Sequence, residues 1–494
     1  MRRYTAAALA LLIMAVCLNA SAVTVWGYDA EDTNHVWTDN LYFQRVASET
    51  DLTFELMQFT NAAEWSRTKA GFKADGELPE ALFKAELTLD ETFDLQEKGV
   101  LMDLAPLIET CMPNLSALLA EHPDWRNAIT MPDGTIPSLP LINLLHNHNA
   151  MWINQNWLQK LGLKVPETKD ELVEVLRSFR DNDPNGNGKQ DEIPMTFLGM
   201  WDLRFLSHAF GFIMDDYGLY LDENGKVQTA LTDERNRELL SWLNTLWTEK
   251  LLDQNGFATS DTYRAITDEK ATISYGIVMG PTPLNLLPSN ALESYVLLPP
   301  LQSDDGSRTY RDLVGDLDRG TFALTVACKE PEKVLAWIDR LYSDEGMMLA
   351  FAGQEGVDYE ERSDGTWGWL ISEEEMYNSV RPTITILDGS AIPGFMSVQL
   401  QQRYDSAATR RIVDAIVRMR EIAVRPLPLT VLTPDQQQEA DRIQAELGKT
   451  TALAMTWFVT GETKMTDETW SAFCKQVEDG GINRLIEIFQ SAIR

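Results

Sequence analysis

Residues 152–194 read WINQNWLQKLGLKVPETKDELVEVLRSFRDNDPNGNGKQDEIP, in which a helical pattern leads into a polar loop. Thr168 followed by Glu171 predicts a capping box at a helix start, because hydroxyl and carboxylate can each accept a hydrogen bond from a free backbone N–H. Apolar residues then recur at helical spacing, at Leu172, Val175, Leu176 and Phe179. The pattern predicts an amphipathic helix with one buried face, followed directly by the loop.

The polar loop has the composition of a calcium site. Calcium binds about six to eight oxygens from carboxylates, amides and backbone carbonyls. The oxygen donors of the loop are Asp183, Asn185, Asn187, Lys189 through its carbonyl, Asp191 and Glu192. An EF-hand would place a bidentate glutamate at the twelfth position, where Pro194 stands, so the match breaks there. An ordinary polar turn is the alternative, but so many donors at this spacing exceed what a turn needs, and we predict a structural Ca²⁺.

The N-terminus has the pattern of a secretory signal peptide. Arg2 and Arg3 precede an apolar run over residues 6–18 that is too short to span a membrane, and residues 20–22 form a small-residue cleavage site. We therefore expect residues 1–22 to be removed on export to a secreted, periplasmic or cell-surface location. Lipid attachment at Cys17 is the alternative; it is less favoured because Val16, before the cysteine, is larger than the residue usual at that place.

Composition excludes some classes of partner. The formal net charge of −33 predicts a surface that repels nucleic acid and anionic membranes. Beyond the signal, Cys111, Cys328 and Cys474 are odd in number and widely spaced, so they predict core thiols and not a disulfide framework. The 14 tryptophans are many for this length; most should be core residues, but flat aromatic faces also stack on sugar rings.

Strand and helix patterns alternate along a chain long enough for two large lobes. Strands are expected at 23–26, 52–56, 136–145, 272–279, 295–298 and 321–326, and helices at 237–252, 331–342 and through most of the region beyond about 435. This alternation is typical of parallel α/β layers.

These motifs together resemble the extracellular solute-binding proteins of family 1, the sugar-binding receptors of ABC importers, over essentially the whole mature chain. The pattern of residues 157–194 is the most specific part, and residues 76–79, 99–108 and 353–359 also match. The loop is similar to the calcium site of alginate-oligosaccharide-binding members, and the chain is also similar to maltose-binding proteins. That resemblance implies the six loop ligands named above, Glu192 included. The chain departs from its relatives at Asn154 and Asn156, where a basic and then an acidic residue often stand.

The resemblance implies a type II periplasmic-binding-protein fold, which is α/β with two lobes, a ligand cleft between them and a helical C-terminal region. Lobe 1 would comprise residues 23–147 and 316–375, and lobe 2 residues 148–315 and 376–494, including the calcium loop 183–192. A sugar that contacts both lobes would stabilise the closed form, which permease subunits of the importer would recognise. We therefore expect a monomer that binds an oligosaccharide and performs no catalysis.

Candidate sugar contacts follow from a general rule for α/β sheets, in which ligands lie beyond the carboxyl ends of strands. Aromatic faces and planar polar groups are the usual partners of sugar rings and hydroxyls. The candidates are Trp26, Tyr28, Asp29, Asn61, Trp65, Trp201, Asp202, Glu355, Trp367 and Trp369. Core packing is the alternative for each tryptophan.

Two other function classes stay open. A secreted carbohydrate-active enzyme would use a carboxylate pair, for which 75 acidic residues supply many candidates, and a receptor could bind a peptide or another non-sugar solute. The sequence has no Gly-x-Ser-x-Gly, His-Glu-x-x-His or phosphate-loop motif, so hydrolase, zinc-protease and nucleotide-binding functions lack support. His146 and His148 would share a strand face, but without a third ligand they favour a surface or hinge position over a metal site.

Overall fold

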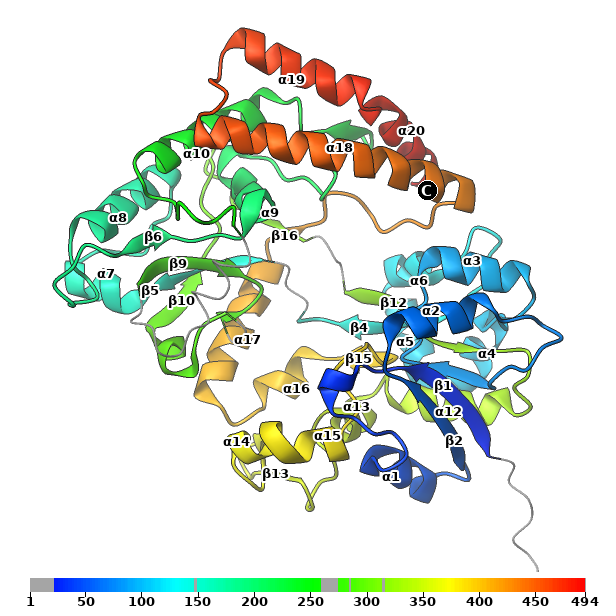
Figure 1. The fold of residues 1–494 in the computed structure, drawn as a ribbon. Coiled ribbons are helices and arrows are strands. Elements are labelled where there is room, and N and C mark those ends of the chain that lie inside the picture. The colour runs from blue at the N-terminus through cyan, green and yellow to red at the C-terminus, as the bar shows by residue number, and fades with distance from the viewer. Residues whose placement is uncertain (1–21, 146–148, 259–273, 284–285, 313–315, 494) are drawn as a thin grey trace, which may run out of the picture. The chain divides into compact units, whose positions relative to one another are not determined.

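The protein is described by a computed structural model that covers residues 22–145, 149–258, 274–283, 286–312 and 316–493 (Figure 1). The chain divides into two compact units, each built from two separate stretches. Unit 1 comprises Met1–Asn143 and Leu317–Leu400, and unit 2 comprises Leu144–Asp316 and Gln401–Arg494. The signal peptide with Cys17, and the pair His146 and His148, lie outside the described residues, apart from Ala22 at the end of the signal.

Unit 1 is built on a six-stranded sheet with the order β15-β4-β12-β3-β1-β2. Its strands are β1 (Val23–Tyr28), β2 (Phe54–Phe59), β3 (Ala81–Phe83), β4 (Leu139–Asn143), β12 (Leu317–Leu324) and β15 (Gly394–Met396). β1 is parallel to both β2 and β3, as the alternating pattern predicts, and β15 is parallel to β4. The expected parallel layers hold for only part of this sheet, because β12 is antiparallel to β3 and β4. A local sequence pattern cannot set that direction, because both partners lie far away in the chain.

Helices surround this sheet and begin either at side-chain caps or at prolines. They are α1 (Leu41–Glu49), α2 (Ala62–Ala70), α3 (Leu89–Glu97), α4 (Ala105–Cys111), α5 (Pro113–Glu121), α6 (Pro123–Ile129), α12 (Pro331–Arg340) and α13 (Asp344–Phe351). Thr88 and Glu91 form a complete capping box at α3. Pro113 and Pro123 open α5 and α6, where a backbone N–H has no helical partner to lose.

The last crossing between the units falls after Leu400 and not near residue 375. Residues 376–400 belong to unit 1 because β15 extends its sheet, with Gly394 opposite Leu141. In addition, the Trp367 indole N–H donates to the Leu400 carbonyl at 2.7 Å. This three-residue strand carries too short a pattern to be predicted from sequence.

Unit 2 is built on a four-stranded mixed sheet with the order β10-β5-β9-β6. The strands are β5 (Ala150–Asn154), β6 (Ile193–Met195), β9 (Tyr275–Gly280) and β10 (Tyr295–Leu298). β5 runs antiparallel to β9 and β10, and only β6 and β9 are parallel. The predicted strand 295–298 is confirmed residue for residue.

Helices of different lengths pack with this sheet in unit 2. They are α7 (Gln155–Leu161), α8 (Lys169–Asp181), α10 (Glu234–Thr248), α17 (Ala407–Arg420), α18 (Pro434–Thr460), α19 (Asp467–Asp479) and α20 (Ile482–Ala492). The helical C-terminal region is thus confirmed, and α18, α19 and α20 lie together in unit 2 (Figure 1). Gly461 ends α18 with a φ of 82°, a left-handed conformation that glycine adopts without steric cost.

Helix α8 has the buried face that its spacing predicts. Leu172, Val175, Leu176 and Phe179 are all buried in the main apolar cluster of unit 2. Only half of the predicted capping box forms. The Thr168 hydroxyl accepts from the Glu171 N–H at 3.3 Å, whereas the Glu171 carboxylate accepts from the N–H of Glu167 at 2.8 Å.

No helix in the described part of the chain is long and apolar enough to cross a membrane. Cys111, Cys328 and Cys474 are free thiols, of which Cys328 is buried and the other two are partly buried. Burial raises the pKa of the Cys328 thiol to about 11, which keeps it protonated and unreactive at neutral pH.

Candidate functional site

The first group of predicted contacts lies at the carboxyl end of β1 in unit 1. β1 extends two residues further than predicted, so Trp26 and Tyr28 lie within the strand and Asp29 follows it. Both aromatic side chains are half-buried and pack against an apolar cluster beside α2. The Trp26 ring lies 6.3 Å from that of Phe59, so part of its surface contacts the core and part remains accessible.

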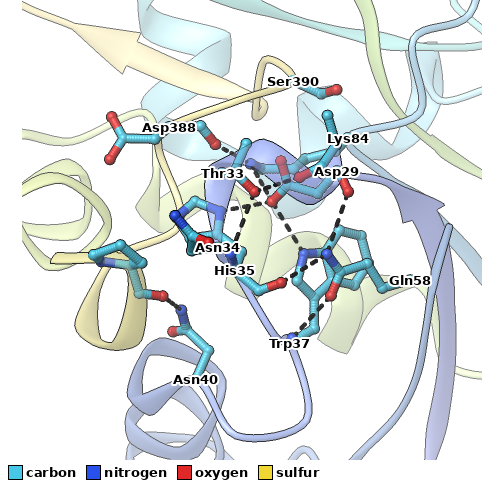
Figure 2. A network of polar contacts seen from close by, with 12 residues as sticks. Asp29, Thr33, Asn34, His35, Trp37, Asn40, Gln58, Lys84, Asp388 and Ser390 are labelled. Carbon is cyan, nitrogen blue, oxygen red and sulfur yellow. Dashed lines mark hydrogen bonds and ion pairs between the residues drawn. The ribbon is translucent and has the colours of Figure 1, made fainter. Parts of the chain in front are cut away.

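Asp29 lies at the centre of a buried network of polar contacts (Figure 2). Its Oδ2 accepts hydrogen bonds from His35 Nδ1 at 2.7 Å, Lys84 Nζ at 2.8 Å and Trp37 Nε1 at 3.2 Å. Lys84 Nζ also donates to the Asp388 carbonyl. Burial by itself would raise the pKa of Asp29, but the hydrogen bond from His35 and the charge of Lys84 outweigh it and lower that pKa. The network ties β1, β3 and the segment around residue 388 together.

The segment that follows Asp388 is fitted closely to this network. Gly389 has a φ of 85°, and a Cβ at this position would lie 2.1 Å from Asp29 Oδ1. Only glycine can therefore occupy the position without displacing the carboxylate. Ser390 Oγ donates to the Glu86 carboxylate at 2.7 Å, which holds the other side of the turn.

The network partners of Asp29 were not predicted from sequence. Lys84 follows the short strand β3 and has a positive φ of 52°, which is unusual for a residue other than glycine. A lysine at the carboxyl end of a strand was the available signal, but its contact with Asp29 depends on the parallel pairing of β1 with β3.

Asn61 and Trp65 have different roles at the start of α2. Asn61 is exposed, and its Oδ1 caps the helix by accepting from the Glu64 N–H at 3.0 Å. Trp65 is only 1% exposed, and its indole N–H donates to the Ala85 carbonyl at 2.8 Å. The rings of Phe59 and Phe72 lie against it. Core packing therefore describes Trp65 in this structure.

In unit 2, Trp201 and Asp202 lie on the short helix α9 (Gly199–Leu203). Trp201 is half-buried, and its indole N–H donates to Asp216 Oδ1 at 2.8 Å. Asp202 is 2% exposed; one of its oxygens accepts from the Asn149 amide and the other from the Leu198 N–H, both at 2.6 Å. Burial raises the pKa of Asp202 to about 7.

Two arginines that the sequence analysis did not single out contact Asp216, the partner of the Trp201 indole. Arg311 is 1% exposed, donates to Asp216 Oδ1 at 2.7 Å, and places its guanidinium 4.3 Å from the centre of the Phe205 ring. Arg204 donates to the Asp216 carbonyl at 2.8 Å. Asp216 thus accepts hydrogen bonds from both arginines and from Trp201, and the last of these bonds fixes the orientation of the Trp201 ring.

The third group of predicted contacts lies on a hairpin of unit 1 formed by β13 (Tyr359–Glu361) and β14 (Trp367–Trp369). Glu355 is exposed, whereas Trp367 and Trp369 are 1% and 9% exposed. Each of these indoles donates to a backbone carbonyl, which is the pattern of a satisfied core tryptophan.

An exposed aromatic residue that the sequence analysis missed lies beside this hairpin. Tyr377 is 49% exposed and its ring stands edge-on to that of Trp369, with centroids 5.3 Å apart. The Arg381 guanidinium lies 4.9 Å from the Tyr377 ring centre. Aromatic residue type alone does not distinguish this accessible ring from the buried ones near it.

The loop predicted to bind calcium is closed around its first carboxylate. Asp183 accepts backbone hydrogen bonds from Gly186 at 2.7 Å, Asn187 at 3.1 Å and Gly188 at 2.9 Å. The side-chain amides of Asn185 and Asn187 donate to Asp191 at 2.9 and 3.0 Å. The amide nitrogens of both asparagines thus face Asp191, and their oxygens accept from the backbone N–H groups of Asn187 and Lys189. Lys189, whose carbonyl is a predicted ligand, is exposed.

Glu192 is the residue of the loop that fits a bound cation best. Both of its carboxylate oxygens are buried, and neither has a hydrogen-bond partner within the described residues. Burial raises the pKa of Glu192, and the charges of Asp183 and Asp191 raise it further. The Lys160 ammonium group lies at this loop and donates to the carbonyls of Asp183 and Pro184 at 2.8 and 3.0 Å. Glu192 is therefore the carboxylate of the loop that a cation such as Ca²⁺ would complement. No cluster of three or more His, Cys, Asp or Glu side chains suited to a metal occurs among the described residues, so a site here depends also on amide and carbonyl oxygens.

Comparison with solved structures defines the class of fold. An extracellular solute-binding protein from Bifidobacterium longum subsp. infantis superimposes with a TM-score of 0.78 at 20% identity, covering 95% of this chain and 97% of its own. The Streptococcus pneumoniae substrate-binding protein FusA, in complex with kestose, superimposes with a TM-score of 0.73 at 23% identity, covering 95% and 98%. The chain has the fold of these solute-binding proteins.

Sequence comparison gives relatives of the same kind. The chain is 31% identical over 318 residues to the fructooligosaccharide ABC transporter substrate-binding protein FusA of S. pneumoniae, an alignment that covers 62% of this chain and 58% of FusA. It is 28% identical over 236 residues to lipoprotein LipO of Bacillus subtilis, covering 43% and 44%. No family model matches the chain. The resemblance to substrate-binding proteins of ABC transporters is confirmed by FusA, and the alignments span less than two thirds of the relatives' lengths.

Proposed function

We propose that this protein is the extracytoplasmic substrate-binding component of an ABC importer and that it captures an oligosaccharide. The observation that carries the proposal is the 31% identity to FusA, together with a shared fold over 95% of the chain. Binding requires no bond to be made or broken, so the protein would act without a catalytic group. Permease subunits would be its partners, and it would act as a monomer.

The half-exposed aromatic residues are the best candidates for sugar contact. Trp26 and Tyr28 in unit 1 and Trp201 in unit 2 combine partial exposure with positions at or after strand ends. Stacking on such a ring removes the C–H face of a sugar from water, while nearby polar groups bind its hydroxyls. Asn61 and Glu355 are the exposed polar candidates. Asp29 and Asp202 are buried, so we propose that they stabilise the fold beside these rings and do not contact the sugar.

Titration calorimetry with fructo-, xylo-, manno- and gluco-oligosaccharides tests this proposal. We expect saturable binding of at least one of them with micromolar or tighter affinity. Trp201→Ala should weaken that affinity about tenfold or more, since loss of a stacked ring on this scale corresponds to roughly 1.4 kcal/mol. Trp457→Ala, at a tryptophan that is 40% exposed on α18, is the matched control and should leave the affinity unchanged. Failure of every sugar to bind would reject the proposal.

We further propose that the loop binds one structural Ca²⁺ through Asp183, Asn185, Asn187, the Lys189 carbonyl, Asp191 and Glu192. The unpartnered Glu192 carboxylate supports this. So do two relatives: a FusA structure is described as an EF-hand mutant, and a structure of the alginate-binding protein AlgQ2 as being without calcium ion. Bound calcium would supply the partner that the buried Glu192 carboxylate lacks within the described residues. Calcium titration by calorimetry should show one site, and Glu192→Gln should weaken it strongly, whereas Glu223→Gln, at an exposed glutamate in another loop of the same unit, should not.

Two simple assays distinguish the proposed function from the two alternative functions, a carbohydrate-active enzyme and a peptide receptor. Incubation with oligosaccharides followed by mass spectrometry would reveal breakdown products if the protein were a carbohydrate-active enzyme. A thermal-shift screen would show stabilisation by peptides and not by sugars if it were a peptide receptor.

We also propose export directed by residues 1–22. Mass spectrometry of the mature protein should find Val23 at the N-terminus, whereas a lipid-modified Cys17 would establish membrane anchoring.

A further inference from the structure

A groove on unit 2 lies between strand β10 and helix α17 and is not used by the function proposed above. Its volume is about 500 Å³. β10 and the residues after it form one wall, α17 and Ile422 form the other, and Figure 1 shows the two elements side by side. The groove lining includes partly exposed aliphatic residues from both walls, namely Val296, Leu297, Pro299, Ala415 and Ile422, which are called its floor below.

The rim of this groove is positively charged in a protein whose formal net charge is −33. Arg410, Arg411 and Arg418 line the groove, with one acidic residue, Asp414, among them. Arg410 forms a long ion pair with Asp405, in which Nη1 and Oδ1 are 3.5 Å apart. Arg411 and Arg418 are exposed and form no ion pair within the described residues. Unpaired arginines on one side of a groove favour a ligand that carries carboxylates, which the guanidinium fork binds in a bidentate manner.

The opposite wall of the groove is the edge of a sheet. β10 is the first strand in the order β10-β5-β9-β6 and pairs, among the described residues, with β5 alone. Tyr295, Val296 and Leu297 all line the groove, although consecutive side chains of a strand point to opposite faces. Trp152 of β5, which pairs with Leu297, also lines the groove. The groove therefore extends over the face of the sheet to the edge of β10, where backbone N–H and C=O groups have no neighbouring strand among the described residues.

We propose that this groove is a docking site for an extended acidic segment of a partner protein, which would add to β10 as a further strand. Its backbone would pair with the free edge of β10, its apolar side chains would contact the aliphatic floor, and its carboxylates would contact Arg411 and Arg418. Strand addition between a sheet edge and a helix is an established mode of peptide recognition. This docking is additional to sugar binding and does not depend on it.

A peptide fits these observations better than the other anionic ligands. An acidic sugar would stack on accessible aromatic faces, but the aromatic residues of the groove, Trp152 and Tyr295, are only 1% and 2% exposed. An anionic membrane surface is flat, whereas this site is a groove between a strand and a helix. Aliphatic side chains and a strand edge are suited to a polypeptide.

Fluorescence anisotropy with a synthetic eight-residue peptide that alternates glutamate and valine tests the proposal on the mature protein. We expect saturable binding that weakens as salt is added. The same peptide with lysine in place of glutamate should not bind. A peptide N-methylated at alternate residues should bind much more weakly, because it cannot pair with a strand edge. Hydrogen exchange at residues 295–298 should slow when the acidic peptide binds.

The charge-reversed variant Arg411→Glu/Arg418→Glu should weaken peptide binding about tenfold or more. Arg67→Glu/Arg442→Glu, at exposed arginines on α2 and α18, changes the net charge equally and should leave it unchanged. Circular dichroism and melting temperature establish that both variants are folded. The proposal would be overturned by absence of peptide binding, by equal binding of the N-methylated peptide, or by tighter binding of an oligogalacturonate or anionic vesicles. Loss of oligosaccharide binding in the first variant would also overturn it, since the groove would then belong to the sugar site.

Discussion

Replacement of Asp29 by asparagine should destabilise the protein far more than removal of an ordinary surface charge. Asp29 and Lys84 are both fully buried, and the carboxylate is the acidic side chain that contacts the Lys84 ammonium group. Asp29→Asn removes the negative charge and leaves the ammonium group buried and uncompensated. Breaking a buried ion pair in this way costs roughly 3–5 kcal/mol, whereas loss of an exposed pair costs up to about 1 kcal/mol. The hydrogen bonds from His35 and Trp37 would be perturbed as well.

Urea denaturation followed by tryptophan fluorescence measures this loss as a change in the free energy of unfolding. The double variant Asp29→Asn/Lys84→Met is the control that separates charge from shape. It removes both charges, so it should be less destabilised than Asp29→Asn alone. A loss below about 1 kcal/mol for Asp29→Asn, or a double variant less stable than it, would refute the reasoning.

The same carboxylate sets a pH dependence. Because the folded-state pKa of Asp29 is lowered, its contribution to stability is present above the unfolded-state pKa of about 3.9 and is lost as pH falls through the lower folded-state pKa. The wild-type protein should therefore lose this contribution on acidification below about pH 4, and Asp29→Asn should not.

Three further predictions concern the calcium loop, Asp202 and Trp65. Chelation with EGTA should lower the melting temperature, because it removes about 2.7 kcal/mol of stabilisation if calcium was present at 100 times its Kd. The melting temperature of Glu192→Gln should change little on chelation. Equal melting temperatures of the wild-type protein with and without EGTA would show that the loop is an ordinary turn. The pKa of Asp202 is raised to about 7, so its contribution to stability is greatest below about pH 4 and is lost as pH rises through 7. In Asp202→Asn the melting temperature should therefore depend less on pH over this range. An unchanged slope of melting temperature against pH would contradict the assignment. Trp65→Ala should reduce the free energy of unfolding by roughly 3–5 kcal/mol, as expected for a buried ring, and a change within about 0.5 kcal/mol would show that the ring is not core.

Much of the secondary structure could be predicted from local patterns. The buried face of α8, strand β10 and the C-terminal helices each depend on periodicity or on caps within a short stretch, and they occur where expected. The direction of β12 and the membership of residues 376–400 depend instead on pairing between distant parts of the chain. No local pattern contains that information.

The candidate site was predictable only in part, for a related reason. Residue type identified Trp26, Trp65 and Trp201 alike, yet Trp65 is packed between rings while the other two are half-buried. Exposure is set by the tertiary neighbours of a side chain and not by its own identity. The contacts of Asp29 with Lys84 and of Trp201 with Asp216 likewise require the folded arrangement.

Equilibrium dialysis of the mature protein against an oligosaccharide mixture, with the bound fraction recovered and analysed by mass spectrometry, tests the central claim most directly. If the protein is a transport receptor, one class of oligosaccharide should be retained in proportion to protein concentration and recovered with its length and linkage unchanged. Retention of no sugar, or recovery of shortened or modified products, would contradict the account.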